Sequence, residues 1–471
     1  MKKADLYELI KTLSSAEKKV FKERHVRKED GNFIRLFNAI AAGEATNDVQ
    51  VKKKFENEKF LSHLGKTKAY LYDALLQSLH LQIQPAYARL TILQKIQQAE
   101  TLLSRKLISQ AEDMYMSTLE LAEQTEELEI SLFIRSQLAS LKTNLHQAAL
   151  TQNREIEFQK KLNELISYRN LFVTVYNSYT QRGTKEWKDI DHYKLHPLLQ
   201  RPKTLLSNPA ERSFEIIHSL LHSVSRDYPK AAQSDLKVTE LIAPISHASP
   251  INEKGYISAL FNTGLNLYGS GKDTTHIIAS LEKFQPTGLW AKSHRFVCLL
   301  RLKLNADSAG VSPARTKKLI AWIEEQLPLH FNELDEAELV KVHHSIAALY
   351  MKDQNYNRAL DYLILITNSK FAREMRPITL RVAMLYQLIA HYELKNFDWL
   401  VTTLRNYRYF QKTNDSFYKI EKLTFDFLSE SIKLKDEKSR QLQKKKLETA
   451  LLQLSGKESG LVYLQSIGWV K

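Results

Sequence analysis

The chain has little cysteine, glycine or proline. Its single cysteine, Cys298, excludes an internal disulfide framework and a metal site built from several thiolates, and it fits a reducing compartment. There are 13 glycines and 11 prolines in 471 residues, so the residues that punctuate strands and turns are scarce. No stretch alternates apolar and polar residues for long enough to be a convincing strand. We therefore expect an all-α protein.

Signals for export and membrane insertion are also missing. The start, MKKADLYELIKTLSSAEKKVF, has no apolar core of the kind that precedes a cleavage site. No window approaches the roughly 18 uninterrupted apolar residues that a transmembrane helix needs. Gly-rich phosphate loops and the GxSxG nucleophile motif are absent as well. We expect a soluble protein of the cytoplasm, with no membrane span and no cofactor.

Positive charge is abundant but diffuse. The formal net charge is +15, which raises the question of a nucleic-acid partner. Residues 85–130, however, carry more acidic than basic side chains, and the remaining excess of Lys and Arg is spread along the chain. This distribution is typical of a solvated surface rather than of a basic arm that grips phosphates.

Proline placement suggests how the chain is organised. Pro85 is the only proline before Pro197, and six prolines then fall between 197 and 250. Proline ends helices at or before the preceding residue, so we expect shorter helices and loops in that middle stretch. Near the end, Trp469 predicts that the last segment folds back to bury its indole. The expected parts are an N-terminal helical module (1–85), a first helical-hairpin block (86–196), the Pro-rich stretch (197–250) and a second helical-repeat block with C-terminal capping helices (251–471).

Two stretches have the spacing of a helical hairpin. In each, a small residue is followed by a bulky one three positions later, by a second small residue at twelve and by another bulky residue at sixteen. Two facing small residues let antiparallel helices approach closely, while the larger ones fill the space beside them. The matching sets are Ala347, Tyr350, Ala359 and Leu363, and Ala99, Leu102, Ala111 and Tyr115.

This spacing resembles the tetratricopeptide repeat, a helix–turn–helix unit of about 34 residues. The matches are irregular, because Val401 and Ile277 occupy positions where two further candidate hairpins should have a small residue. The resemblance implies an irregular tetratricopeptide-like α-solenoid, preceded by the small N-terminal helical bundle.

The chain also resembles a group of uncharacterised, cytoplasmic helical proteins of the Bacteroidota. The cues are LYELIKTLSSAEKKVF, KTKAYLYDALLQSL, HYELKNFDWL and LRNYRYFQK. The resemblance covers most of the length, contains no catalytic motif and implies no known activity.

Three side chains in ERSFEIIHSLLHSV are candidates for a metal site. His218 and His222 are four residues apart and share a helix face, and Glu215 lies three residues before His218. Two imidazoles and a carboxylate can bind a divalent metal. The HExxH base and a further partner are missing, so we favour packing histidines and predict no metal.

Four lysines suggest a nucleic-acid site. Lys52, Lys53, Lys66 and Lys68 flank FLSHLGKTKAYLYDALL, which has the look of a helix–turn–helix whose second helix would enter a major groove. That helix offers little Arg, Asn or Gln at its start for base edges. A structural bundle or protein-docking module is the favoured interpretation of this segment.

The leading functional hypothesis is a non-enzymatic scaffold that binds a protein or peptide on its helical repeats. One alternative is a DNA-binding regulator with the N-terminal module on DNA and the repeats as a sensor. A second alternative is a metal-dependent hydrolase built on His218 and His222.

Overall fold

The structure is a computed structural model of the 471-residue chain, and it is described in ranges. The described residues are 5–25, 31–82, 87–141, 145–181, 187, 190–200, 205–308, 313–330, 334–375, 377–413, 419–434, 436–453, 464 and 469.

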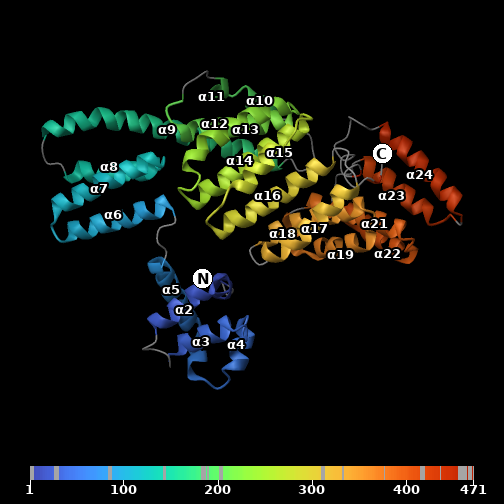
Figure 1. The fold of residues 1–471 in the computed structure, drawn as a ribbon, viewed down its shortest axis with the longest axis horizontal. Coiled ribbons are helices and arrows are strands. Elements are labelled where there is room, and N and C mark those ends of the chain that lie inside the picture. The colour runs from blue at the N-terminus through green and yellow to red at the C-terminus, as the bar shows by residue number, and fades with distance from the viewer. Residues whose placement is uncertain are drawn as a thin grey trace. The chain divides into compact units, whose positions relative to one another are not determined.

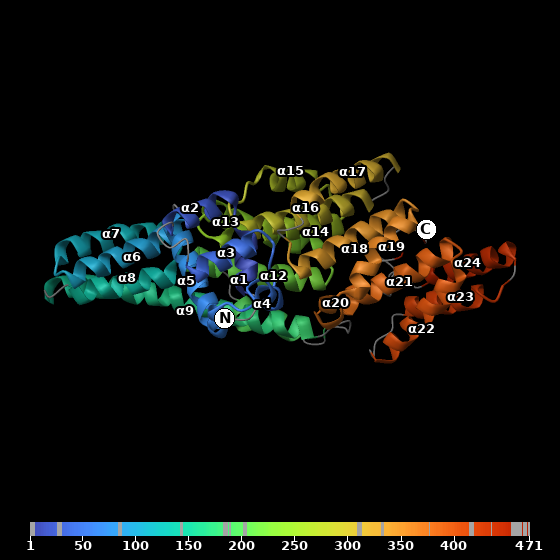
Figure 2. The same ribbon diagram turned by 90° about the horizontal axis from the view of Figure 1, so that it is seen from below.

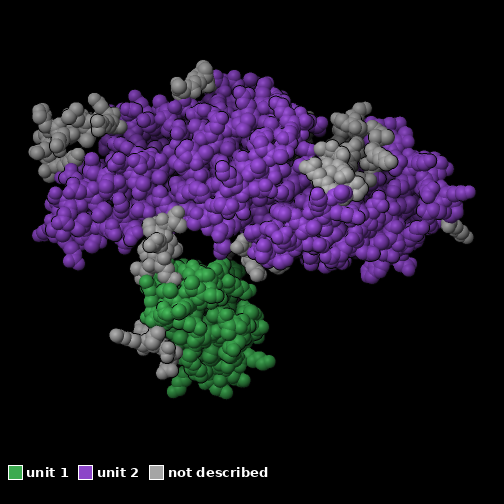
Figure 3. Space-filling model, in the orientation of Figure 1, with its two compact units in different colours: residues 1–86 green, residues 87–471 purple. Residues whose placement is uncertain are grey.

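The chain forms two compact units, Met1–Ala86 and Tyr87–Lys471 (Figure 3). The boundary falls beside Pro85, which itself lies outside the described residues. The described residues contain helices and no strand. No helix among them is long and apolar enough to cross a bilayer.

The first unit is a small helical bundle with its own core. Phe21, Phe37 and Leu71 are among the side chains that are almost fully buried in it. The predicted capping box is confirmed, because the Ser14 hydroxyl accepts from the Glu17 N–H while the Glu17 carboxylate accepts from the Ser14 N–H. The helices of this unit are α1 (Asp5–Thr12), α2 (Ser15–Arg24), α3 (Asn32–Ala41), α4 (Asp48–Lys54), the 3₁₀ turn η2 (Lys59–His63) and α5 (Leu64–Gln82).

The second unit is a succession of helices. In order along the chain they are α6 (Ala88–Ser104), α7 (Ile108–Gln124), α8 (Leu128–Leu141), α9 (Leu145–Gln181), α10 (Ile190–Lys194), α11 (Pro197–Gln200), α12 (Asn208–Val224), α13 (Tyr228–Ile242), η3 (Ala243–Ile245), α14 (Pro250–Gly269), α15 (Thr275–Lys283), α16 (Leu289–Ser308), α17 (Pro313–His330), α18 (Glu336–Lys352), α19 (Tyr356–Asn368), α20 (Lys370–Met375), α21 (Pro377–Glu393), α22 (Phe397–Thr413), α23 (Lys419–Ser431) and α24 (Glu437–Leu452).

Most of these helices pack on helices that are next or nearly next to them in the chain. The most extensive contacts join α6 to α7, α12 to α13, α13 to α14 and α18 to α19. The colours of Figures 1 and 2 accordingly run in chain order across the unit. Near the chain end the indole of Trp469 is buried, and its Nε1 donates to Glu393 Oε1 at 2.7 Å. The prediction that this tryptophan folds back is confirmed.

Prolines in the middle stretch start helices instead of shortening them. Pro209, Pro229 and Pro250 each lie in the first turn of a helix, α12, α13 and α14 respectively, where the missing N–H has no intrahelical partner to lose. The helices α12 and α13 have 17 and 15 residues. The same stretch also contains two short elements, α11 with 4 residues and η3 with 3. The expectation of shorter helices therefore holds for α11 and η3 but not for α12 and α13.

Five hairpins within the described residues end their first helix in the same way. A residue other than glycine adopts φ between 59° and 62°, its N–H reaches the carbonyl three residues back, and the next N–H reaches the carbonyl five residues back. This is the Schellman motif, which satisfies the last carbonyls of a helix. We call the residue with positive φ the turn residue; the five are Lys106, Glu126, Arg226, Gln354 and Lys395.

The shared turn places equivalent residues in register. In all five described hairpins the second helix begins two residues after the turn residue. The fifth residue after it is fully buried in each case. Those buried residues are Ala111, Ser131, Ala231, Ala359 and Leu400.

The two hairpins predicted from spacing, α6–α7 and α18–α19, belong to this set. Of their eight matched residues, seven are buried and Leu102 is half-buried. In the α21–α22 hairpin the residue in register is Leu400, whereas Val401 is 42% exposed. The prediction from sequence spacing, which placed Val401 at the small-residue position of that hairpin, is therefore wrong by one residue.

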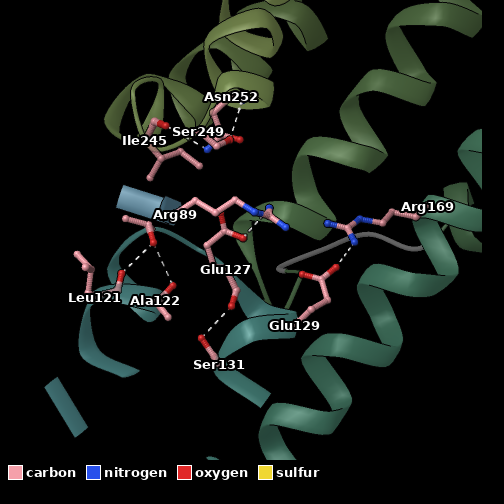
Figure 4. Close-up of polar contacts among 11 residues, drawn as sticks. Arg89, Leu121, Ala122, Glu127, Glu129, Ser131, Arg169, Ile245, Ser249 and Asn252 are labelled. Carbon is pink, nitrogen blue, oxygen red and sulfur yellow. Dashed lines mark hydrogen bonds and ion pairs between the residues drawn. The ribbon is translucent and has the colours of Figure 1, made fainter. Parts of the chain in front are cut away.

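Acidic residues around the α7–α8 turn bind arginines from three other helices. The Glu126 carboxylate pairs with Arg212 of α12. Arg89 Nη1 of α6 lies 3.0 Å from Glu127 Oε2, and Arg169 of α9 pairs with Glu129 (Figure 4). These pairs join α6, α9 and α12 at one turn. They also account for part of the acidic excess of residues 85–130.

Overpacking at the small position tests the close approach of α18 and α19. We expect Ala359→Leu to lower the free energy of unfolding of the second unit by about 1–3 kcal/mol, because the added atoms enter a filled contact. Urea unfolding followed by circular dichroism measures the change. Asn357→Leu, which places the same side chain at an exposed position of α19, should change stability by less than about 0.5 kcal/mol. Equal effects from the two variants would show that Ala359 is not at a close contact.

Candidate functional site

A cavity of about 320 Å³ opens between α9, α12, α13 and α14. Its walls combine aromatic and aliphatic side chains with hydroxyl, amide and carboxyl groups, the mixture typical of ligand sites. The lining residues are Phe172, Tyr176, Ile216, Ser219, Leu220, Ser223, Asp235, Val238, Gly255, Ser258, Ala259, Asn262, Leu265 and Asn266.

The aromatic wall comes from α9. Phe172 and Tyr176 stack with ring centroids 5.6 Å apart. Tyr176 is 47% exposed and Ile216 of α12 is 38% exposed. Two large side chains that line a cavity and still face solvent mark its mouth, so the cavity is open to a ligand from outside.

Asp235 is the single lining residue with an ionisable carboxyl group. The side chain is 3% exposed, and its Oδ2 accepts from Asn266 Nδ2 at 2.7 Å. The Ser219 hydroxyl is its other hydrogen-bond partner. Burial raises the pKa of Asp235 to about 6, against the lowering effect of these two neutral donors. The group is therefore a buried carboxylate at neutral pH without strong compensation.

The hairpin register shows how unusual this carboxylate is. Asp235 is the ninth residue after its turn residue, Arg226. The equivalent positions of the α6–α7, α18–α19 and α21–α22 hairpins hold Tyr115, Leu363 and Leu404, all buried. The α7–α8 hairpin has Arg135 there, which pairs with Glu123. An acidic residue without a charged partner thus occupies a position at which three of the other four described hairpins bury a large aromatic or aliphatic residue.

Other buried carboxylates have stronger partners. Glu253 of α14 is fully buried and accepts four hydrogen bonds, from Tyr87 Oη, His247 Nδ1 and the N–H groups of Thr287 and Gly288. Burial by itself would raise the pKa of Glu253, but these donors together hold it below its usual value. Its role is to fasten α14 to the start of α6 and to the segment before α16.

Of the five buried carboxylates that the structure describes, four have a cation or a backbone N–H as a partner. Glu127 pairs with Arg89, Glu421 with Arg381, and Glu338 accepts from the Asp335 N–H. Glu253 accepts from two backbone N–H groups. The fifth, Asp235, has neither kind of partner among the described residues, and it is the one that lines the cavity.

The metal candidates serve the helix packing around this hairpin. The His222 carbonyl accepts the turn hydrogen bond from Asp227, and its Nδ1 lies 3.6 Å from Asp227 Oδ2. The centroids of the His218 and Phe214 rings lie 4.3 Å apart. Glu215 is hydrogen-bonded to Ser234. Glu215 and His218 line a second cavity of about 530 Å³, whose lining does not include His222.

The part of the chain that the structure describes contains no cluster of metal-ligating side chains. No three His, Cys, Asp or Glu side chains there come together closely enough to hold an ion. Cys298 is buried, and its Sγ lies 3.7 Å from Nε2 of His294, which also contacts the Ser258 hydroxyl at 2.9 Å. Burial raises the pKa of the Cys298 thiol to about 12, so the group is a neutral packing residue at physiological pH.

The four candidate lysines do not form one surface. Lys52, Lys53 and Lys66 are exposed, but Lys68 is 4% exposed. Lys68 Nζ lies 2.6 Å from Asp48 Oδ1 and 4.9 Å from the centre of the Tyr7 ring. This lysine therefore fastens α5 to α4 and α1.

The segment predicted as a helix–turn–helix also differs from that expectation. The 3₁₀ turn η2 runs directly into α5 at Leu64, and Gly65 lies inside the helix. The stretch therefore does not consist of two α-helices separated by a turn.

Sequence inspection missed Asp235, although a signal exists. Ser219 and Ala231 are twelve residues apart, as are the small residues of the two recognised hairpins. At the bulky positions, however, this hairpin has His222 and Asp235. These polar residues hide the repeat, and the first of them, His222, fits the spacing of a metal ligand instead.

Replacing the two carboxylates by amides should have opposite effects on stability. Glu253→Gln leaves N–H donors facing an amide NH₂, so we expect the free energy of unfolding to fall by about 2–4 kcal/mol. Asp235→Asn removes a poorly compensated charge and should stabilise the fold by about 1–3 kcal/mol at pH 7.5. Since the folded pKa of Asp235 is raised, to about 6 from 3.8, this gain should vanish as the pH falls to 4. Urea unfolding at both pH values measures it, and a large loss for Asp235→Asn would contradict the assignment.

Buried neutral histidines predict sensitivity to acid. Burial, with Arg301 nearby, lowers the pKa of His344 to about 4. Between pH 6.5 and 4 the unfolded chain therefore binds the proton and the folded chain does not, so stability falls as the pH falls. We expect His344→Phe to reduce this dependence by up to about 1.4 kcal/mol per pH unit. His276→Phe, at an exposed position, is the matched control, and an unchanged slope in His344→Phe would refute the prediction.

Comparison of the chain with protein-family models, with curated proteins and with solved structures gives no match in any of the three. The functional interpretation therefore rests on the geometry of the hairpins and of the cavity.

Proposed function

We propose that residues 87–471 form a tetratricopeptide-like helical-repeat scaffold that binds a protein or peptide and has no catalytic activity. The observation that carries this proposal is the common turn register of the five described hairpins. A repeated hairpin that packs on its chain neighbours builds a continuous surface from many helices, and such surfaces recognise extended segments or helices.

The cavity supplies the scaffold with an anchoring point. It lies within one of the five described hairpins, α12–α13, and between that hairpin and the helices α9 and α14 on either side. Its size suits a single side chain of a bound peptide. The exposed faces of Tyr176 and Ile216 at the mouth would contact the peptide beside that side chain.

The first unit has a structural or protein-docking role in this proposal. Its own apolar core is complete without the repeats. Lys68, one of its four candidate phosphate contacts, is paired internally.

A peptide array tests the proposal. The full chain, labelled and purified, is applied to random 12-residue peptides, and affinities of the peptides retained are measured in solution. We expect a subset to bind, and Tyr176→Ala to weaken binding at least about tenfold, because an aromatic contact at the centre of an interface is lost. Tyr409→Ala removes the same side chain from an exposed position of α22 and should leave binding unchanged. A chain that retains no peptide, or equal affinities for wild type and Tyr176→Ala, would refute the proposal.

A further inference from the structure

We propose that the cavity between α9, α12, α13 and α14 holds an arginine or lysine side chain of a bound peptide, with Asp235 as its counterion. The inference rests on the proposed function, and it names the chemistry of the partner at the anchoring point.

The first argument is charge complementarity. Asp235 is the one residue of the lining with a carboxyl group, and no lysine, arginine or histidine lines the cavity. No described residue forms an ion pair with it, and its two hydrogen-bond donors, Asn266 and Ser219, are neutral. A buried carboxylate without a cation costs free energy that a ligand cation can recover.

The second argument is the apolar part of the cavity lining. A guanidinium or ammonium group with an apolar stem needs a polar end and an apolar passage. The stacked rings of Phe172 and Tyr176 and the aliphatic side chains of Ile216, Leu220 and Val238 provide the passage. Aromatic faces also attract cations directly. A neutral apolar ligand would leave the Asp235 carboxylate buried without a cation. The negative charge of an acidic ligand would be repelled by that carboxylate.

The third argument comes from the repeat register. At the position of Asp235 three other described hairpins bury Tyr115, Leu363 and Leu404. The α7–α8 hairpin has a charged residue there, Arg135, but it is paired with Glu123, whereas Asp235 has no ion-pair partner among the described residues. An apolar residue there would fill the space and stabilise the packing of the hairpin. The chain instead keeps a carboxyl group and a cavity at the same place, and binding of a cation accounts for both.

The test uses the full chain and the same peptide array. We expect the retained peptides to be enriched in arginine or lysine flanked by apolar residues. For the tightest arginine peptide, replacing arginine by the neutral isostere citrulline should weaken binding at least about tenfold. Asp235→Asn should weaken the arginine peptide by a similar factor and abolish its advantage over the citrulline peptide.

Two further variants keep the result interpretable. Asp235→Leu installs the residue of the α18–α19 hairpin, so it should be folded, by circular dichroism and thermal unfolding, and should fail to bind the arginine peptide. Glu240→Gln removes a carboxylate at an exposed position of the same helix and should bind as wild type does. Glu240 lines the second cavity but not the cavity that contains Asp235.

The outcomes separate this inference from the scaffold proposal. Retained peptides without basic enrichment, or with equal affinity for wild type and Asp235→Asn, overturn the cation site and leave the scaffold standing. A chain that retains no peptide overturns both. Agmatine, which carries the same guanidinium without a peptide, should compete only weakly; competition as strong as that of the arginine peptide would overturn the peptide as the source of the cation.

Discussion

The helices of the 87–471 unit bury their apolar sides mostly against helices close to them in the chain, and this constraint shapes the rest of the unit. The five described hairpins meet it with one turn, in which a residue of positive φ closes the first helix and starts the second two residues later. The turn fixes the register, and the register brings a buried residue to the contact between the two helices, as at Ala359 and Ala231. Stability in such an array comes from contacts between successive helices.

Within this array, a buried charged residue at a packing position can serve a ligand instead of the fold. Glu253 and Asp235 are both buried carboxylates in the same group of helices, yet their surroundings move their pKa values in opposite directions. Four donors hold Glu253 in its ionised form, so its charge is part of the framework. Asp235 has only two neutral donors and an open cavity beside it. The contrast separates a structural carboxylate from one that is available to a partner.

Several charged side chains of this chain connect helices that are distant in the sequence. The acidic residues at the α7–α8 turn pair with arginines of α6, α9 and α12, and Lys68 connects α5 with α4 through Asp48. Such pairs between elements distant in sequence cannot be recognised from composition. A high content of lysine and arginine is therefore compatible with a fold in which particular basic residues are internal partners.

The amino-acid sequence by itself determined the helical class, the capping box at Ser14, and the two hairpins whose small and bulky residues keep ordinary spacing. These features depend on neighbours a few residues apart, which local patterns record. Proline content predicted that helices end near Pro209 and Pro229, whereas α12 and α13 begin there. A proline that starts a helix and one that ends a helix look alike in the sequence without the surrounding turn. Only the tertiary structure decided that Val401 is exposed while Leu400 is buried, that Lys68 is paired, and that Asp235 lines a cavity. Each of these depends on which helices meet, and burial between helices follows from contacts across the fold.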